Sequence, residues 1–155
     1  MPTRDDWIRL AAFIDGEGAI YVKPVHGQNR KYTQLVISIA NCDPRLPMWC
    51  KETFGGSVHR TKSNPRHNAK WREAWSWRIY SSTAEGVLVN CLPYFLLKKE
   101  QADVALAYRK TFLSKYGKGA GRELSEEDFA KRESFEIQLK KLQRELPDAV
   151  KAAFN

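Results

Sequence analysis

Apolar residues near the start of the chain recur at the spacing of one helix face. The residues that fit the i, i+3, i+4, i+7 spacing are Trp7, Leu10, Ala11 and Ile14. Thr3 precedes them as a helix-capping residue, and Gly16 and Gly18 follow them as helix breakers. The pattern therefore predicts a helix over residues 5–15.

Apolar and polar residues then alternate in four later segments, as they do in β-strands with one buried face. The apolar positions are Ile20 and Val22 in the first segment, Leu35, Ile37 and Ile39 in the second, Val58 in the third, and Trp75, Trp77 and Ile79 in the fourth. A turn at residues 26–30 indicates that the first two strands form a hairpin. The other face is rich in hydroxyl, amide and cationic side chains, which we expect either to face solvent or to lie in a DNA major groove.

Helical patterns follow over residues 46–54, 84–91 and 125–146. An apolar segment that begins at Pro93 opens into one more helix, which is predicted to end near residue 113. The chain is thus interpreted as a single domain over residues 1–155, with a core over 1–113, a basic loop over 114–124 and a C-terminal helix over 125–146.

The charge balance narrows the choice of partner. The 155 residues include 26 Lys and Arg against 18 Asp and Glu, a net charge of +8. This excess favours nucleic acid, and after it an anionic membrane, while the alternative is a charge that only keeps the protein soluble. No apolar run is long enough to cross a membrane and no signal peptide is visible, so a soluble, intracellular protein is expected. Cys42, Cys50 and Cys91 form no CxxC pair and are expected to be reduced, partly buried core thiols.

The end of the first predicted helix carries an electrostatic conflict. Asp15 and Glu17 place negative charge at the helix C-terminus, where the helix dipole is already negative. A bound cation would resolve this conflict, and the adjacent small residues Ala11 and Ala12 would allow a second helix to approach closely. The alternative is an ordinary amphipathic helix that stops at a glycine.

Residues 10–18, LAAFIDGEG, resemble the signature helix of the LAGLIDADG homing endonucleases. The identities are Leu10, Ala11, Ile14, Asp15 and Gly18. The stretch LPYFLLKKEQA, which begins at residue 92, is also similar to that family. The resemblance implies an α+β fold of the order αββαββα, in which a four-stranded antiparallel, saddle-shaped sheet packs on helices.

The resemblance also implies catalytic roles for particular residues. Glu17 falls on the position of the metal-binding catalytic acid, and the backbone carbonyl of Gly16 is expected to share the metal. Lys98 takes the place of an active-site lysine, with its neighbour Lys99 as the open alternative. Asp43 lies near the position of a water-organising polar residue, whereas Asp15 is implied to fix a turn.

A single signature helix implies an assembly of two copies, because cutting both strands of a duplex requires two active sites. The expected homodimer interface comprises Leu10, Ala11, Ala12, Ile14 and Asp15. The resemblance implies a long pseudo-palindromic DNA target, cut to leave short 3′ overhangs. It also implies Mg²⁺ as the cofactor, with Mn²⁺ as a substitute and with Ca²⁺ binding without supporting cleavage.

The polar face of the predicted sheet supplies the expected DNA contacts. Those contacts are Tyr21, Lys23, Gln34, Ser38, His59, Thr61, Arg72, Ser76, Arg78 and Tyr80. Lys62, Arg66 and Lys70 in the following loop are expected to meet phosphates.

Two further classes of protein stay open at the level of sequence. One is a nucleic-acid binder that does not cleave, such as an intron RNA maturase. The other is a basic structural protein in which residues 10–18 serve only as a dimerisation helix. An intact Glu17 together with Lys98 favours an enzyme over both.

Overall fold

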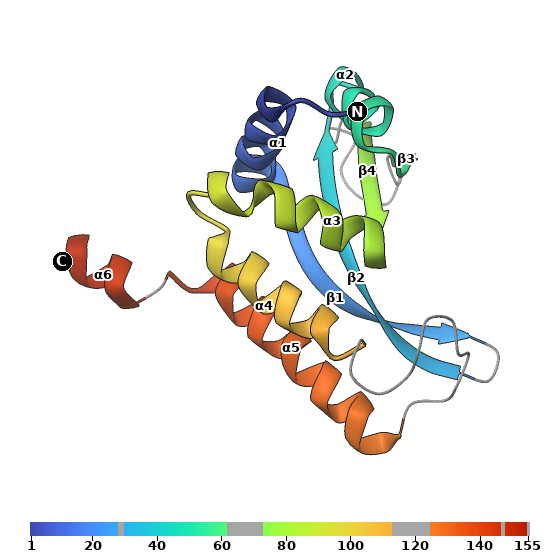
Figure 1. Ribbon diagram of the computed structural model, residues 1–155, viewed down its shortest axis with the longest axis vertical. Helices are drawn as coiled ribbons and strands as arrows, with labels where there is room; N and C mark the ends of the chain where they lie inside the picture. The colour runs from blue at the N-terminus through green and yellow to red at the C-terminus, as the bar shows by residue number, and fades with distance from the viewer. Residues whose placement is uncertain (28–29, 62–72, 113–124, 147, 155) are drawn as a thin grey trace.

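The computed structural model describes residues 1–27, 30–61, 73–112, 125–146 and 148–154. The elements are α1 (Arg4–Glu17), β1 (Gly18–Gly27), β2 (Arg30–Asn41), α2 (Arg45–Phe54), β3 (Ser57–Thr61), β4 (Ala74–Tyr80), α3 (Ser81–Cys91), the 3₁₀ turn η1 (Leu92–Tyr94), α4 (Lys99–Lys110), α5 (Glu126–Arg144) and α6 (Asp148–Phe154). Figure 1 shows that α1 leads directly into β1. Up to α3, this order is the predicted αββαββα arrangement.

The first helix begins with the predicted cap. The Thr3 hydroxyl accepts a hydrogen bond from the backbone N–H of Asp6, and the Asp6 carboxylate accepts one from the backbone N–H of Thr3. The helix continues through Gly16 and ends at Glu17, two residues beyond the prediction, because Gly18 is the first residue with an extended backbone. Glu17 therefore belongs to the last helical turn.

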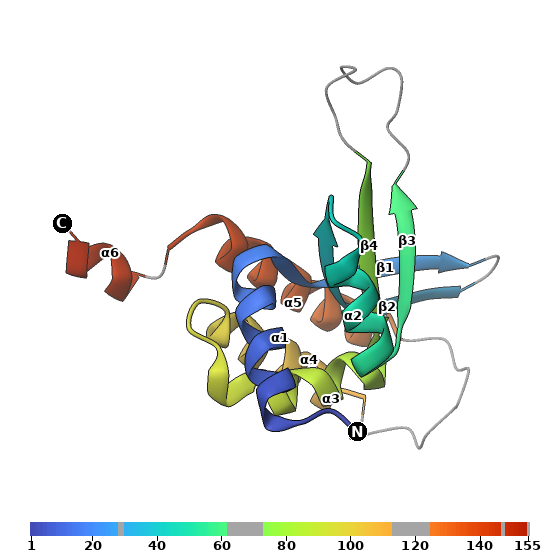
Figure 2. The same ribbon diagram turned by 90° about the horizontal axis from the view of Figure 1, so that it is seen from above.

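The four strands form one antiparallel sheet in the order β1-β2-β4-β3. The predicted apolar positions of β1, β2 and β4 share one face, and Ile20, Ile37 and Trp77 on that face are completely buried. Figure 2 shows α1, α3, α4 and α5 gathered on one side of the strands. The helices thus enclose the apolar face, and in the part of the chain that the structure describes no helix covers the other face.

One position on the uncovered face departs from the predicted alternation. Val36 falls among polar neighbours in the pattern but is completely buried. Its cross-strand partners are Tyr21 on β1 and Tyr80 on β4, and all three side chains lie on the same face. The two tyrosines flank Val36, so this part of the outer face is a small apolar row rather than an exposed polar surface.

Several helices begin or end at other residues than the sequence predicts. The third helix begins at Ser81 rather than residue 84, and α4 ends at Lys110 rather than near residue 113. The Ser125 hydroxyl accepts from the backbone N–H of Asp128 and starts α5 as predicted. The short helix α6 has no counterpart in the predicted elements, and Figures 1 and 2 both show it extending away from the other helices. The predicted basic loop over residues 114–124 lies outside the described residues.

The cysteines separate into two kinds. Cys50 and Cys91 are buried free thiols, as predicted, and burial raises the pKa of each to about 12. Cys42 is exposed, so its assignment to the core was wrong: it follows the last residue of β2 and lies in the turn before α2. No helix among the described residues is long and apolar enough to cross a membrane.

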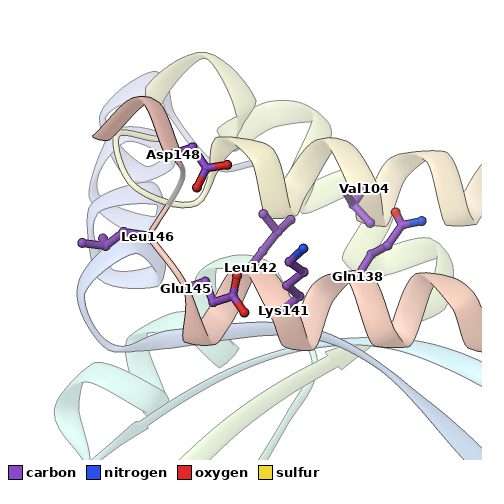
Figure 3. Close-up of a pocket in the computed structure, with 7 residues that line it drawn as sticks. All are labelled: Val104, Gln138, Lys141, Leu142, Glu145, Leu146 and Asp148. Carbon is purple, nitrogen blue, oxygen red and sulfur yellow. The ribbon is translucent and has the colours of Figure 1, made fainter. Parts of the chain in front are cut away.

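A pocket of about 350 Å³ lies between α4, the end of α5 and the start of α6. Its lining is Val104, Gln138, Lys141, Leu142, Glu145, Leu146 and Asp148. Figure 3 shows Leu142 between the two longer helices, while Leu146 points away from them. The lining includes none of the predicted site residues, and its charges are of both signs.

Candidate catalytic site and nucleic-acid interface

Glu17 lies at the end of α1 with an exposed side chain and one strong partner. The side-chain amide of Asn41 donates a hydrogen bond to Oε2 of Glu17 at 2.6 Å. Asn41 is the last residue of β2, and its own Oδ1 accepts from the backbone N–H of Asp43 at 2.8 Å. The end of β2 therefore orients the Glu17 carboxylate and leaves its other oxygen for a ligand.

Asp15 points the opposite way from Glu17, into the protein. Its carboxylate accepts hydrogen bonds from the backbone N–H groups of Leu96, Leu97 and Lys98, at 2.7, 3.2 and 2.9 Å. These groups immediately precede α4, where helix N–H donors lack partners within the helix. Asp15 thus joins the end of α1 to the start of α4, a contact that fits the turn-fixing role implied by the resemblance.

The same connection brings a lysine to the end of α1. The Lys98 ammonium donates to the backbone carbonyl of Asp15, whereas Lys99 is exposed in the first turn of α4. Partial burial lowers the pKa of Lys98 below the ordinary lysine value, and the nearby Asp15 carboxylate opposes that shift. Of the two lysines that the sequence leaves open, the structure brings Lys98 to the end of α1.

Asp43 forms an ion pair with Arg45. Its carboxylate accepts from the Arg45 guanidinium, with both oxygens 3.0 Å from Nε, and from the Arg45 backbone N–H at 2.9 Å. Hydrogen bonding to Arg45 lowers the pKa of this exposed carboxyl to about 2. The contact to Glu17 comes from Asn41, which is not among the predicted site residues. A polar side chain on the last residue of a strand that otherwise alternates was the signal that could have pointed to it.

The residues present fit a divalent cation only in part. Among the described residues, no three His, Cys, Asp or Glu side chains gather to form a closed metal site. Glu17 supplies one carboxylate, and Gly16 lies in the last turn of α1, where carbonyl groups lack helical donors. Mg²⁺ is commonly held by one or two carboxylates together with waters and substrate phosphates. The donor set therefore suits a hard cation that arrives with a phosphate.

The predicted homodimer residues need correction. Leu10, Ala11 and Ile14 are completely buried and Asp15 is 9% exposed, because these side chains pack into the protein's own core. Leu10, Ala11 and Ile14 therefore have no exposed side-chain surface with which to meet a second copy. Ala12 is the only member of the predicted set that is exposed.

A different face of α1 is open. Ile8, Ala12 and Gly16 follow each other at the i, i+4, i+8 spacing of one helix face, and all three are exposed. A Cβ added to Gly16 would meet nothing within 4 Å, so this glycine is not required by the packing of its own chain. Small residues on an open helix face permit close approach of another backbone.

The uncovered face of the sheet collects nearly all the predicted DNA contacts. These are Tyr21 and Lys23 on β1, Gln34 and Ser38 on β2, His59 and Thr61 on β3, and Ser76, Arg78 and Tyr80 on β4. The strand register places them in rows across the sheet, for example Ser38, Arg78 and Ser57. Arg72, Lys62, Arg66 and Lys70 lie outside the described residues.

Hydrogen bonds order part of this face. The Arg78 Nε donates to the Ser76 hydroxyl at 3.2 Å, and the Ser57 hydroxyl lies 2.9 Å from Nε2 of His59. The Lys23 ammonium lies 5.7 Å from the centre of the Tyr80 ring. Ser76 itself is 5% exposed, so it contributes through Arg78 more than through its own surface.

Solved structures with the same arrangement decide the fold. Neither a family model nor a curated protein sequence matches this chain. The archaeal intron-encoded homing endonuclease I-Vdi141I, complexed with DNA, matches 89% of this chain and 84% of its own, with a TM-score of 0.68 at 14% identity. The homing endonuclease I-CvuI, in complex with its target in the presence of Ca, matches 90% of this chain and 96% of its own, at TM-score 0.61 and 16% identity. The chain has the LAGLIDADG homing endonuclease fold.

The LAGLIDADG homing endonuclease I-LtrWI bound to target DNA is also similar, at TM-score 0.60 and 23% identity. The match covers 85% of this chain but 42% of I-LtrWI. Within the LAGLIDADG fold of the present chain, Glu17 and Lys98 lie at one end of α1, and the open sheet face begins where α1 passes into β1.

Proposed function

We propose that this protein is a site-specific, divalent-metal-dependent DNA endonuclease that cuts both strands of its target as a homodimer. The main support is the grouping at the end of α1. An exposed carboxylate is oriented by Asn41, and the ammonium of Lys98 is held at the same helix end, beside a sheet face suited to DNA. The structures reported above include proteins bound to DNA targets, and this likeness in fold agrees with the proposal.

Each residue has a part in the proposed phosphodiester hydrolysis. Glu17, with the carbonyl of Gly16, would hold Mg²⁺ against a phosphate oxygen. When bound, the ion would polarise the phosphate and acidify a water molecule. Asn41 fixes the direction of the Glu17 carboxylate, and Lys98 supplies positive charge to the developing negative charge of the transition state.

The homodimer part of the proposal is supported by exposed apolar surface near the site. Leu96 and Leu97 are 86% and 69% exposed, although their backbone N–H groups are bound by Asp15. The open α1 face formed by Ile8, Ala12 and Gly16 carries no charge. Two copies related by a two-fold axis would place two Glu17 residues over one duplex, and the target would be pseudo-palindromic. Cleavage across the minor groove would then leave short 3′ overhangs.

Selection from random DNA allows the protein itself to identify its target. Randomised duplexes are selected for binding in Ca²⁺, and the enriched sequences are then incubated with protein in Mg²⁺ or Mn²⁺. We expect Mg²⁺ and Mn²⁺ to support cleavage of the enriched sequence and Ca²⁺ to support binding alone. Sequencing of the ends should show 3′ overhangs, and light scattering should show a dimer.

A matched pair of glutamate variants separates catalysis from binding. Glu17→Gln should abolish cleavage while binding to the enriched duplex survives, because the amide keeps the size but loses the charge that attracts the metal. Glu133→Gln, at an exposed position on α5, should cleave as the original protein does. Selective binding of nucleic acid without cleavage by the unaltered protein would contradict the endonuclease and favour the maturase class.

A further inference from the structure

Arg78 lies on an interior strand of the uncovered sheet face, in a row close to the α1–β1 junction. It lies on β4, an interior strand, opposite Ser38 on β2 and Ser57 on β3. Both neighbours are short hydroxyl side chains, so the longer guanidinium projects beyond them. Because β4 is flanked by a strand on each side, Arg78 is placed to reach the floor of a groove laid against this face.

One hydrogen bond within the protein orients the Arg78 guanidinium. Its Nε donates to the Ser76 hydroxyl at 3.2 Å, and Ser76 is almost fully buried beneath it. Among the described residues, Arg78 forms no ion pair with a carboxylate. The outward face of the described strand positions contains no Asp or Glu at all. Within the part of the chain that the structure describes, Nε carries the one hydrogen bond of this guanidinium, so its two terminal nitrogens can bind an outside partner.

A second arginine nearby shows the contrasting case. Arg60 on β3 forms an ion pair with Glu73, whose carboxylate oxygens lie 2.7 and 2.6 Å from one terminal nitrogen of Arg60. The Arg60 guanidinium also lies 6.0 Å from the centre of the Trp75 ring. Its partner in the register is Trp75, on the opposite face of the sheet from Arg78. Arg60 is thus paired with a carboxylate of its own chain, whereas Arg78 has no such partner among the described residues and can bind a ligand.

We propose that Arg78 is a specificity-determining residue that recognises one guanine in each half of the DNA target, with Ser76 as its positioning residue. This assignment rests on the proposed function. An arginine whose Nε is already used presents its two terminal nitrogens as a fork, which matches the O6 and N7 acceptors of guanine in the major groove. A place on an interior strand favours a base edge over a phosphate, since phosphates line the rims of the groove.

Selection from randomised duplexes tests the assignment directly, with the original protein compared with Arg78→Ala, Arg78→Lys, Ser76→Ala and Arg60→Ala. The original protein should enrich a guanine at one symmetric pair of positions. Arg78→Ala should lose that preference about tenfold or more while preferences elsewhere stay. Arg78→Lys should keep most of the affinity but discriminate guanine less well, because an ammonium lacks the rigid fork of a guanidinium. Ser76→Ala should weaken the same preference, and Arg60→Ala should leave it intact. Thermal unfolding of each variant checks that the fold is kept.

The possible failures are distinguishable. If the original protein selects no sequence, the proposed function is contradicted. If it selects a sequence and Arg78→Ala keeps every base preference, only the assignment of Arg78 is overturned. A uniform loss of affinity across all sequences in Arg78→Ala would also overturn it, since that pattern belongs to a phosphate contact.

Discussion

The amide of Asn41 holds one carboxylate oxygen of Glu17 at 2.6 Å, across 24 positions of the sequence. The contact joins the last residue of α1 to the last residue of β2. It uses one oxygen of the acid and leaves the other exposed for a metal. Because Asn41 also accepts from the backbone N–H of Asp43, the turn before α2 fixes the amide in place. The direction of the acid is thus set by the sheet as well as by its own helix.

Removal of the Asn41 amide should slow cleavage without removing DNA binding. We expect Asn41→Ala to lower the single-turnover cleavage rate by about 10- to 100-fold, the range seen when a partner of a metal ligand is lost. Affinity for the same duplex, measured by gel shift in Ca²⁺, should change by no more than about threefold, since Asn41 is not among the expected base contacts.

Asn90→Ala provides the matched control. Asn90 lies on α3, where its amide donates to the backbone carbonyl of Gly86 at 2.8 Å and its side chain is exposed. This variant should cleave at the original rate. Equal rates for Asn41→Ala and the original protein would show that Glu17 does not depend on the amide.

Loss of the Asp15 carboxylate should lower the stability of the folded protein. Asp15→Ala leaves three backbone N–H groups at the start of α4 without their acceptor. Hydrogen bonds to a charged acceptor are the strong ones, so we expect a loss of about 2–4 kcal/mol in the free energy of unfolding. Urea unfolding of the DNA-free protein measures this loss. Asp103→Ala, at an exposed position of α4, should cost less than about 0.5 kcal/mol. Comparable midpoints for the two variants would contradict the capping role.

Two glycines in the signature helix should respond differently to the same substitution. A Cβ at Gly18 would lie 2.7 Å from the Cα of Ile14, whereas a Cβ at Gly16 would meet nothing within 4 Å. Gly18→Ala should therefore disrupt the junction of α1 and β1 and lower the thermal midpoint. Gly16→Ala should leave the folded subunit intact but weaken a dimer in which a second backbone approaches this helix face.

Sedimentation and thermal unfolding distinguish these effects. A Gly16→Ala protein that keeps both its thermal midpoint and its dimer would contradict the proposed use of the Ile8, Ala12 and Gly16 face. A Gly18→Ala protein as stable as the original would contradict the steric argument for the α1–β1 junction.

The local patterns predicted most of the fold, because β1, β2 and β4 each carry one apolar face and the helices before α6 have a recognisable start or stop. Val36 is an exception, because it is completely buried on the outer face, where its cross-strand neighbours are tyrosines of two other strands. The candidate site likewise contains residues that the sequence predicts and one that it does not. Glu17 and Lys98 are predicted from a resemblance, but the Asn41 contact to Glu17 depends on where β2 ends in space.

The dimer residues illustrate a further limit. Leu10, Ala11 and Ile14 are apolar and helical, and the pattern alone cannot say whether such a face meets its own sheet or another subunit. Here the sheet and helices of the same chain enclose them. The exposed face of α1 is marked by small residues instead, a weaker signal that becomes visible only after the packing is known.

Lys98 predicts a pH dependence with a definite sign. Burial lowers its pKa from the ordinary value of 10.5, so in the folded protein the ammonium loses its proton at a lower pH than in the unfolded chain. The folded state consequently gains stability from this group as pH rises through the lowered pKa.

Catalysis should change in the opposite direction, because only the protonated form of Lys98 offers positive charge to the transition state. In a series of increasing pH, the cleavage rate should therefore fall at a lower pH than the titration of an ordinary lysine would produce. Lys98→Arg, which stays charged, should cleave more slowly at neutral pH but lack the alkaline fall. Lys99→Arg should keep the original profile, since its side chain is exposed. An alkaline fall that persists in Lys98→Arg would assign the titration to another group.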